Sequence, residues 1–298
     1  MTDQTRRPFG GKWSDDKLDA LRAYLRAYTT ALKNTPFKLV YIDAFAGAGT
    51  HEVSQEQNGG LFEETLFAEE AQYRHGSPLI ALENTPAFEQ FIFIERDAAS
   101  LQKLKQQVEA SGAAQERHVE FLLGDANQHL QDLAHRSWGS RRAVAFLDPF
   151  ALHVTWQTIE EIAKTQAIDM WLLFPAMAVN RMLTKTGEIP EAWAAKLTLT
   201  FGSDGWRDFF YEKSTADLFG DEALLKTPKI FEKLSEYITL RLKTVFAGVH
   251  EKPLILRNTT GAPLFLLCFA CGNPRGVSIA IRIAQHIINQ KSHGNQLD

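Results

Sequence analysis

The 298-residue sequence contains very little cysteine: its two copies, Cys268 and Cys271, lie close together in the segment CFAC. A structural zinc site needs four ligands, so this pair would supply only half of one, and a redox-active pair is the other special interpretation. The surrounding segment is apolar and typical of a strand, in which alternate side chains point to opposite faces. We therefore interpret both cysteines as ordinary strand residues and expect no metal site.

An excess of positive charge is also lacking, since 32 lysines and arginines stand against 36 acidic residues, a formal net charge of −4. This balance gives no global attraction to nucleic acid or to an anionic membrane, so any RNA contact has to be local. Long apolar runs are missing as well. No stretch reaches the roughly 18 to 20 apolar residues that span a bilayer, and the first residues do not resemble a signal peptide. We expect a cytoplasmic protein with no membrane partner.

What the sequence does have is enough apolar surface for a core, with 45% hydrophobic residues. An amphipathic helix is expected over residues 14–34, with Ser14 as its N-cap. Five short apolar runs then alternate with helical stretches, and this alternation predicts a parallel sheet with helices on both faces. The five expected strands are Leu39 to Asp43, Phe91 to Glu95, Val119 to Leu123, Ala143 to Asp148 and Ile168 to Phe174.

Near the C-terminus, two further apolar runs, 254–257 and 264–270, flank the turn-rich segment NTTGAP and predict an antiparallel hairpin. Five parallel strands followed by a hairpin correspond to the Rossmann-like, seven-stranded sheet of class I methyltransferases. Residues 176–245 are helical and aromatic in pattern and show no strand signal. We interpret them as a helical insertion, acting as a cover, within a single domain over residues 1–298, because no linker marks their ends.

The first strand runs into a loop of small residues, Asp43-Ala44-Phe45-Ala46-Gly47-Ala48-Gly49. Small residues let the backbone turn sharply and approach a ligand at the carboxyl end of the strand. The dinucleotide pattern G-x-G-x-x-G is incomplete, because Glu52 stands where the third glycine belongs. A carboxylate such as Asp43 instead suits the ammonium group of S-adenosylmethionine. A purely structural turn is the alternative. The cofactor-binding candidates here are Asp43, Phe45, Gly47 and Gly49.

Two more acidic residues follow neighbouring strands. Glu95 ends the second strand, where a carboxylate can accept hydrogen bonds from both ribose hydroxyls, and a charge at a helix N-terminus is the alternative. Asp125, followed by Ala126, comes after the third strand and is expected at the adenine amino group. Asp125 can equally be the N-cap of the next helix, expected over Asn127 to His135. The two roles are compatible.

The fourth strand ends in Asp148-Pro149-Phe150, the most informative triplet in the sequence. In amino methyltransferases, a polar residue followed by proline and an aromatic presents a side-chain oxygen and a backbone carbonyl to an exocyclic amine, while the ring stacks on the base. Methyl transfer would then be a direct displacement in which positioning supplies most of the rate. A buried strand end and turn is the alternative.

Three residues beyond the triplet are candidates for the acceptor pocket. His153 is a candidate proton acceptor and Trp156 a stacking wall, although packing is an equal alternative for each. Arg181 lies on the helix after the fifth strand, where it would meet a phosphate or remain a solvated surface residue.

The chain resembles the three-Cys-motif partner (TcmP) family, on the segments YIDAFAGAGTHEV, GSPLIALE, FIFIERD, LDPFALHVTWQTIEEIA and IDMWLLFP. This resemblance implies a class I methyltransferase-like fold and a partner protein that carries a three-cysteine, radical-enzyme-like motif. The Asp-Pro-Phe triplet is also similar to that of tRNA guanine-N2 methyltransferases, which continue with glycine where this chain has Ala151.

These observations favour an S-adenosylmethionine-dependent methyltransferase that acts on an exocyclic amine of a nucleic acid base, RNA being favoured, together with a three-Cys-motif partner. The alternative is a non-catalytic or small-molecule-directed, cofactor-binding partner subunit of a radical-type enzyme. A nicotinamide-dependent oxidoreductase is disfavoured by the absent third glycine.

Overall fold

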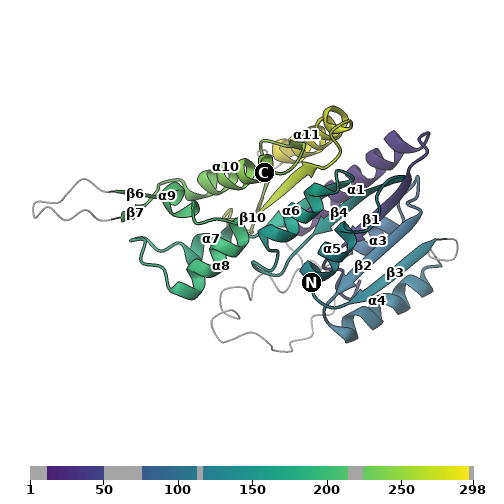
Figure 1. Cartoon of the computed structure of the whole chain (residues 1–298), viewed down its shortest axis with the longest axis horizontal. Helices are drawn as coiled ribbons and strands as arrows, with labels where there is room; N and C mark the ends of the chain where they lie inside the picture. Colours follow the sequence, from purple (N-terminus) through teal and green to yellow (C-terminus); the bar gives the residue numbers. More distant parts are fainter. Residues whose placement is uncertain (1–11, 50–75, 113–116, 214–223, 295–298) are drawn as a thin grey trace, which may run out of the picture.

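The computed structural model describes residues 12–49, 76–112, 117–213 and 224–294. Its centre is a mixed sheet with the strand order β3-β2-β1-β4-β5-β10 (Figure 1). The first five strands are parallel to one another and β10 is antiparallel to β5. Their bounds are β1 (Lys38–Asp43), β2 (Gln90–Glu95), β3 (His118–Leu123), β4 (Arg141–Leu147), β5 (Ile168–Phe174) and β10 (Pro263–Cys271).

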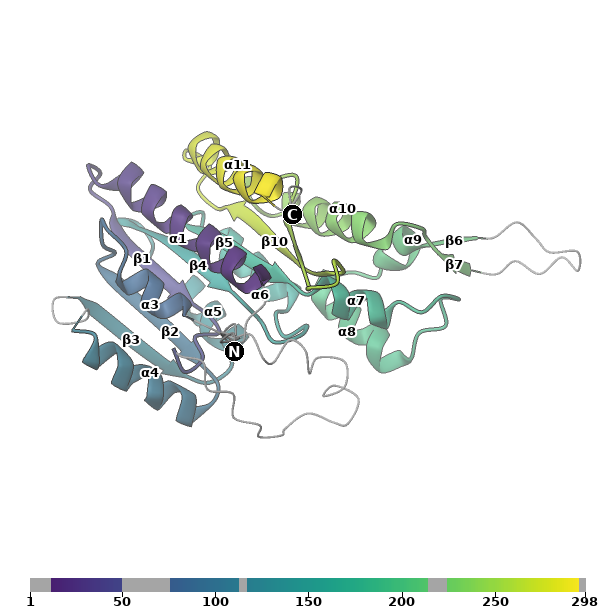
Figure 2. The ribbon, with the colours of Figure 1, turned by 180° about the vertical axis from the view of Figure 1, so that it is seen from behind.

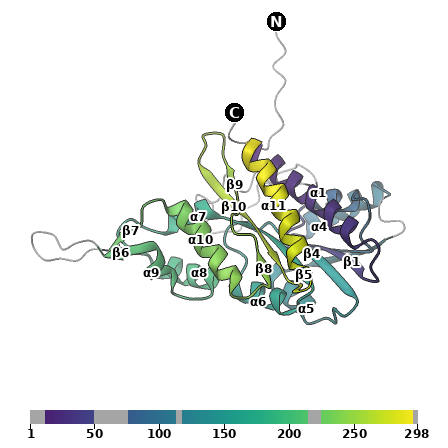
Figure 3. The ribbon, with the colours of Figure 1, turned by 90° about the horizontal axis from the view of Figure 1, so that it is seen from above.

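Two short strands, β8 (Gly248–Val249) and β9 (Leu254–Arg257), both pair with β10 in antiparallel fashion. Because β5 already occupies one edge of β10, β8 and β9 share the other edge and together form one interrupted outer strand (Figure 3). The sheet therefore has seven strand positions, of which six run in one direction and β10 alone runs in the opposite direction. This order confirms the predicted class I methyltransferase-like fold and its C-terminal hairpin.

Helices cover both faces of the sheet, as the alternation predicted. On one face lie α1 (Lys12–Leu32), α3 (Ser77–Leu82), α4 (Ala98–Ala110) and α11 (Val277–Gly294), and α1 and α11 stand in front of the strands in Figure 2. On the other face lie α5 (Ala126–Ala134), α6 (Trp156–Lys164) and four further helices. Each face has its own apolar core, because successive residues of a strand alternate between the faces.

The cysteines follow this alternation. Cys268 packs in the core of one face and Cys271 in that of the other, and both are buried as free thiols. Burial raises the pKa of both thiols, which keeps them protonated and unreactive near neutral pH. Their interpretation as ordinary strand residues is confirmed.

Residues 176–245 form α7 (Ala176–Met182), α8 (Glu191–Phe201), α9 (Trp206–Phe210) and α10 (Ile230–Lys243). The segment is mainly helical, as expected, but the expected absence of strands was wrong, because β6 (Tyr211–Lys213) and β7 (Leu224–Lys226) form a small antiparallel sheet there. Strands of three residues are too short to give a periodic signal in the sequence. The helices share one apolar core with the sheet, in which Trp206 and Phe210 lie together with Ala145 and Met170.

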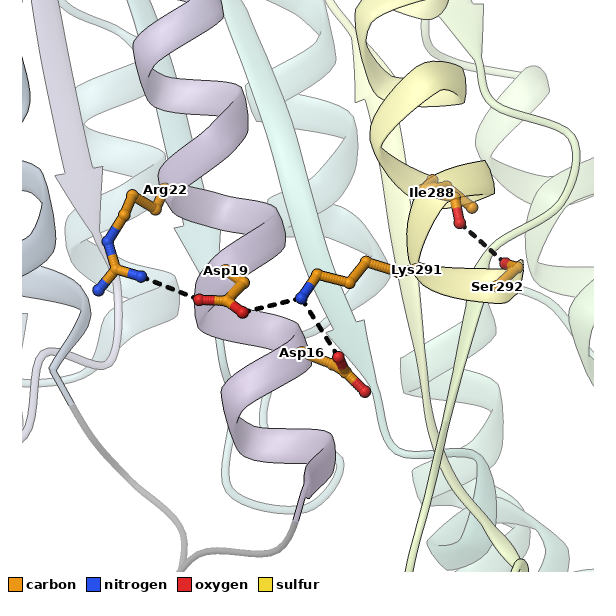
Figure 4. A network of polar contacts seen from close by, with 6 residues as sticks. All are labelled: Asp16, Asp19, Arg22, Ile288, Lys291 and Ser292. Atoms are coloured by element: carbon orange, nitrogen blue, oxygen red, sulfur yellow. Dashed lines mark hydrogen bonds and ion pairs between the residues drawn. The ribbon is translucent and has the colours of Figure 1, made fainter. Parts of the chain in front are cut away.

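The N-terminal helix α1 begins at Lys12, so Ser14 lies buried in its first turn and the N-cap expected there was wrong. One side of α1 packs against α11 (Figure 4). Lys291 of α11 places its Nζ 2.8 Å from Oδ2 of Asp19 and 3.3 Å from Oδ1 of Asp16. The position of α1 is therefore fixed by charge as well as by apolar packing. Among the described residues, no helix combines the length and apolar character needed to cross a membrane.

Candidate active site

Three acidic residues stand at the carboxyl ends of three neighbouring strands. β1 lies between β2 and β4, and Asp43 is in register with Phe93 on one side and Phe146 on the other. Asp43 ends β1, Glu95 ends β2, and Asp148 is the first residue after β4. The side chains predicted for the cofactor and for the acceptor therefore meet at one edge of the sheet, which is where ligands bind in open α/β folds.

The loop after β1 is tied to both neighbouring strands. The backbone N–H of Ala44 donates to the carbonyl of Phe146 over 3.0 Å, and that of Ala46 donates to the carbonyl of Ile94 over 2.9 Å. Gly47 and Gly49 have φ angles of 63° and 78°, the left-handed region that glycine adopts at no steric cost. This is why the predicted small-residue loop needs glycine at these two positions.

Glu95 connects this loop to the start of α4. Its buried carboxylate accepts a hydrogen bond from Gly47 N–H at 2.8 Å through Oε2 and from Asp97 N–H at 2.9 Å through Oε1. The N-cap of α4 is Asp97, so the alternative that Glu95 caps a helix was wrong. A carboxylate has about four acceptor positions, so Glu95 keeps capacity for ribose hydroxyls.

Asp43 is fully buried, and its carboxyl group is engaged within the protein. Oδ1 accepts from the Phe45 N–H at 3.3 Å and Oδ2 accepts from the Tyr41 hydroxyl at 3.1 Å. Burial raises the pKa of Asp43 to about 7, and the nearby charge of Asp148 adds to this, while hydrogen bonds from Ser77 and Phe45 oppose it. Contact with an ammonium group of a cofactor remains a prediction for this residue.

Asp125 is the N-cap of α5, as the structural alternative proposed. Its Oδ1 accepts from the N–H groups of Asn127 and Gln128 at 2.9 and 3.2 Å, and the residue is exposed. Ala126 is buried as the first residue of α5. An exposed cap residue stays accessible to a ligand, so capping does not conflict with the predicted contact between Asp125 and an adenine amino group. That contact remains a prediction.

Asp148 forms an ion pair that the sequence interpretation did not foresee. Nζ of Lys17, from α1, lies 2.6 Å from its Oδ2, with the Lys17 side chain 1% and the Asp148 side chain 14% exposed. The ring of Trp13 lies 5.3 Å from the same ammonium. A signal for Lys17 was present, because Trp13, Lys17 and Leu21 recur at helical spacing on the buried face of α1.

The backbone after Pro149 turns through an unusual conformation. Ala151 has a φ of 55°, in the left-handed region that favours glycine, and it packs with Ala178 and the half-buried Phe150. The turn at this alanine therefore has the backbone conformation that glycine prefers. The Phe150 ring centroid lies 5.8 Å from that of His153.

Asn127, which was not among the candidates, holds the loop between β4 and α6. Its Nδ2 donates to the His153 carbonyl at 2.8 Å, and its Oδ1 accepts from Thr155 N–H at 2.9 Å and from the Thr158 hydroxyl at 2.8 Å. The half-buried His153 is therefore fixed by its backbone. Its role as a proton acceptor remains a prediction.

Trp156 is buried, with 3% of its surface exposed. Its Nε1 donates to Glu160 at 2.8 Å, and the guanidinium of Arg241 lies 4.4 Å from its ring centroid. A Cβ added at Gly202 would come within 2.0 Å of the indole ring. This environment supports packing over a stacking wall for a base. Arg181 is exposed on α7, and its contact with a phosphate stays a prediction.

An apolar pocket lies directly behind the triplet, between the ends of β4 and β5 and helices α8 and α10. It is lined by Pro149, Ala151, Leu152, Val154, Ile159, Leu172, Phe174, Pro175, Thr200 and Ile238. The insertion therefore reaches the back of the turn that carries Asp148, through Thr200 and Ile238.

No family model matches the chain and no curated protein is similar to it in sequence, so the resemblance to three-Cys-motif partners stays a prediction. Among solved structures, the protein LPL1258 from Legionella pneumophila is 13% identical, with 94% of this chain and 93% of that chain covered and a TM-score of 0.46. Trm1 from Pyrococcus horikoshii, solved with S-adenosyl-L-methionine, is 12% identical over 79% of this chain and 62% of its own, with a TM-score of 0.36. The N-terminal domain of EvdMO1 with S-adenosylhomocysteine is 10% identical over 84% and 79%, also with a TM-score of 0.36. Because these scores lie below 0.5, the fold assignment rests on the strand order and not on these proteins.

Proposed function

We propose that this protein is an S-adenosylmethionine-dependent methyltransferase that acts on an exocyclic amine of a nucleic acid base, with RNA as the favoured substrate. The observation that carries the proposal is the convergence of Asp43, Glu95 and Asp148 at the ends of three adjacent strands. The first two belong to the cofactor side of this edge, and the third opens the Asp-Pro-Phe turn.

The residues present fit such a cofactor. Among the residues that the structure describes, a Cβ added at Gly47 would meet nothing within 4 Å, so these residues leave room on the outer side of the loop. Glu95 lies beside that loop and would hold the ribose hydroxyls, and Asp125 at the N-terminus of α5 would receive the adenine amino group. When bound, the cofactor supplies an electrophilic methyl group.

On the acceptor side, groups that orient the amine matter more than a strong base does. Asp148 and the carbonyl of Pro149 would accept hydrogen bonds from the amine, which aligns its lone pair for displacement, and Phe150 would stack on the base. Good orientation is worth roughly 7 to 11 kcal/mol of the barrier. The left-handed turn at Ala151, at the glycine position of the similar tRNA enzymes, supports a base as acceptor.

A second candidate function is a cofactor-binding subunit without transferase activity, assembled with a three-cysteine, radical-type partner. The sequence resemblance favours it, and the ion pair is compatible with it, because Lys17 at 2.6 Å already satisfies one oxygen of the Asp148 carboxylate within the protein. Such a partner is part of both proposals and follows from the sequence resemblance alone.

A transfer assay with a radiolabelled methyl donor and pools of RNA and DNA, with and without a three-cysteine partner, separates the two. We expect label in an RNA base. Asp148→Ala should lower transfer by about 10² to 10³ and leave the cofactor Kd nearly unchanged. Phe150→Ala should weaken acceptor binding by roughly 1 to 3 kcal/mol. Cofactor binding without transfer under every condition would favour the second candidate.

A further inference from the structure

Lys17 is a charged side chain in a place where lysine is rarely found. It comes from the N-terminal helix, 131 residues before its partner Asp148, and only 1% of its side chain is exposed. Removing an ammonium and a carboxylate from water is costly, and their attraction offsets this only when the geometry is good. At 2.6 Å between Nζ and Oδ2, the two groups are in direct contact.

The charges around this pair place Lys17 at the reacting edge of the sheet. Asp43 and Tyr41 of β1 both interact electrostatically with Asp148, and Asp148 raises the pKa of each beyond the effect of burial. Lys17 therefore places a positive charge from α1 beside the carboxyl groups of Asp43 and Asp148 at the end of the sheet.

The helix that carries Lys17 is itself held from two sides. The Trp13 ring lies 4.9 Å from that of Phe265 on β10, and Lys291 of α11 binds Asp16 and Asp19 on the outer side of α1 (Figure 4). The Lys17 ammonium therefore lies on a helix whose position is fixed, which a residue that positions a reacting group requires.

We propose that Lys17 is a positioning residue for methyl transfer, which holds Oδ2 of Asp148 so that Oδ1 is presented to the acceptor amine. This inference rests on the proposed function. It makes α1 a part of the acceptor site as well as a packing helix. Lys17 acts through Asp148 and does not itself contact the methyl donor.

Three variants test this role: Lys17→Met, which keeps the shape and removes the charge, Lys17→Arg, which keeps the charge, and the control Lys291→Met. The control removes a lysine that pairs with α1 but leaves the Trp13–Phe265 contact and the Lys17–Asp148 ion pair in place. The readouts are cofactor Kd by calorimetry and the single-turnover rate on the acceptor found for the parent. We expect Lys17→Met to slow transfer by about 10²-fold, as misplacement of a reacting group does. Its cofactor Kd, and both values for Lys291→Met, should stay within about twofold of the parent. Lys17→Arg should recover most of the lost rate.

A comparison in the Asp148→Ala background keeps the test decisive if Lys17→Met alone does not fold. In the Asp148→Ala background, adding Lys17→Met should change the transfer rate by less than about twofold, because the group through which Lys17 acts is gone. A further large loss in that background would overturn the inference, as would an active Lys17→Met or a Lys291→Met as slow as Lys17→Met. If the parent itself transfers no methyl group, the proposed function fails and this inference fails with it.

Discussion

At the scale of single residues, Ala151 shows how the turn after β4 is specified. Its φ of 55° costs an alanine about 1 to 2 kcal/mol relative to ordinary backbone conformations. Glycine would relieve this cost, but it would also lose a buried methyl group and gain freedom in the unfolded chain. These effects nearly cancel, so alanine is tolerated at this position.

We therefore expect Ala151→Gly to change the free energy of unfolding by less than about 1 kcal/mol. Ala151→Val should destabilise the fold by about 2 kcal/mol or more, because a β-branched residue is a genuine outlier at positive φ and the site is closely packed. Urea denaturation of the two variants and the parent measures both values. A valine variant as stable as the parent would contradict the left-handed turn.

Asp43 contributes a stability that falls as the pH rises, opposite to the usual contribution of a paired acid. Its pKa is raised from 3.8 to about 7 in the folded protein, so the folded state holds its proton more tightly than the unfolded chain does. This contribution to stability is complete below about pH 4, declines as the pH rises, and is lost above about pH 7. The shift corresponds to at most about 4 kcal/mol.

Asp43→Asn, which resembles the protonated acid, should remove this decline. We expect the parent to lose more stability than the variant between pH 4.5 and pH 7.5, measured by urea denaturation at both values. Comparing the two proteins at each pH cancels the opposite contribution of acids such as Asp97 and Glu120, whose pKa values are lowered. Parallel pH profiles would mean that Asp43 is ionised in the folded state.

At the scale of elements, two neighbouring acids between β2 and α4 make different contacts. Asp97 caps α4 by accepting from Ser100 N–H, whereas Glu95, two residues earlier, points its carboxylate to the loop after β1. The two acids lie two residues apart and carry the same charge. Glu95 contacts the loop of the proposed cofactor site, whereas Asp97 contacts the first turn of α4.

This contrast supplies a controlled test of the cofactor edge. Glu95→Ala and Asp125→Ala should each weaken binding of S-adenosylmethionine by about 1 to 3 kcal/mol, through loss of hydrogen bonds. Asp97→Ala should lower helix and protein stability by about 1 kcal/mol and leave the cofactor affinity near that of the parent. Calorimetry gives the affinities. If Glu95→Ala and Asp125→Ala both bind like the parent, the cofactor lies elsewhere.

At the scale of the whole molecule, the insertion and the sheet bury their side chains together. Trp206, Phe210 and Leu234 belong to the same apolar core as Ala145 of β4 and Met170 of β5. A segment that shares its core in this way would expose large aromatic side chains if it were cut out. We propose that it serves as a cover that selects the acceptor, as part of one domain.

Limited proteolysis tests the single domain. We expect no stable fragment that corresponds to residues 176–245, because the segment lacks a core of its own. The measurement is a time course resolved by mass spectrometry, under native conditions and after mild destabilisation with urea. A protected fragment of this region that remains folded after purification would instead indicate an independent domain.

The sequence by itself determined the five parallel strands, the C-terminal hairpin and the edge at which the candidate site lies. Short apolar runs, small residues after β1 and acids at strand ends are local signals, and parallel strands bring their carboxyl ends to one edge whatever the packing. Ile168–Phe174 and Leu254–Arg257 were predicted to the residue, and the bounds of the other predicted strands differ by one or two positions.

Only the tertiary structure decided which charges meet. Lys17 and Asp148 are 131 residues apart, and their contact depends on α1 packing over β4, which no local pattern encodes. The burial of Asp43, the enclosure of Trp156 by Arg241 and Gly202, and the short strands β6 and β7 likewise arise from long-range packing. Local propensity sets where elements form, but desolvation and pairing of charges depend on neighbours that only the folded chain supplies.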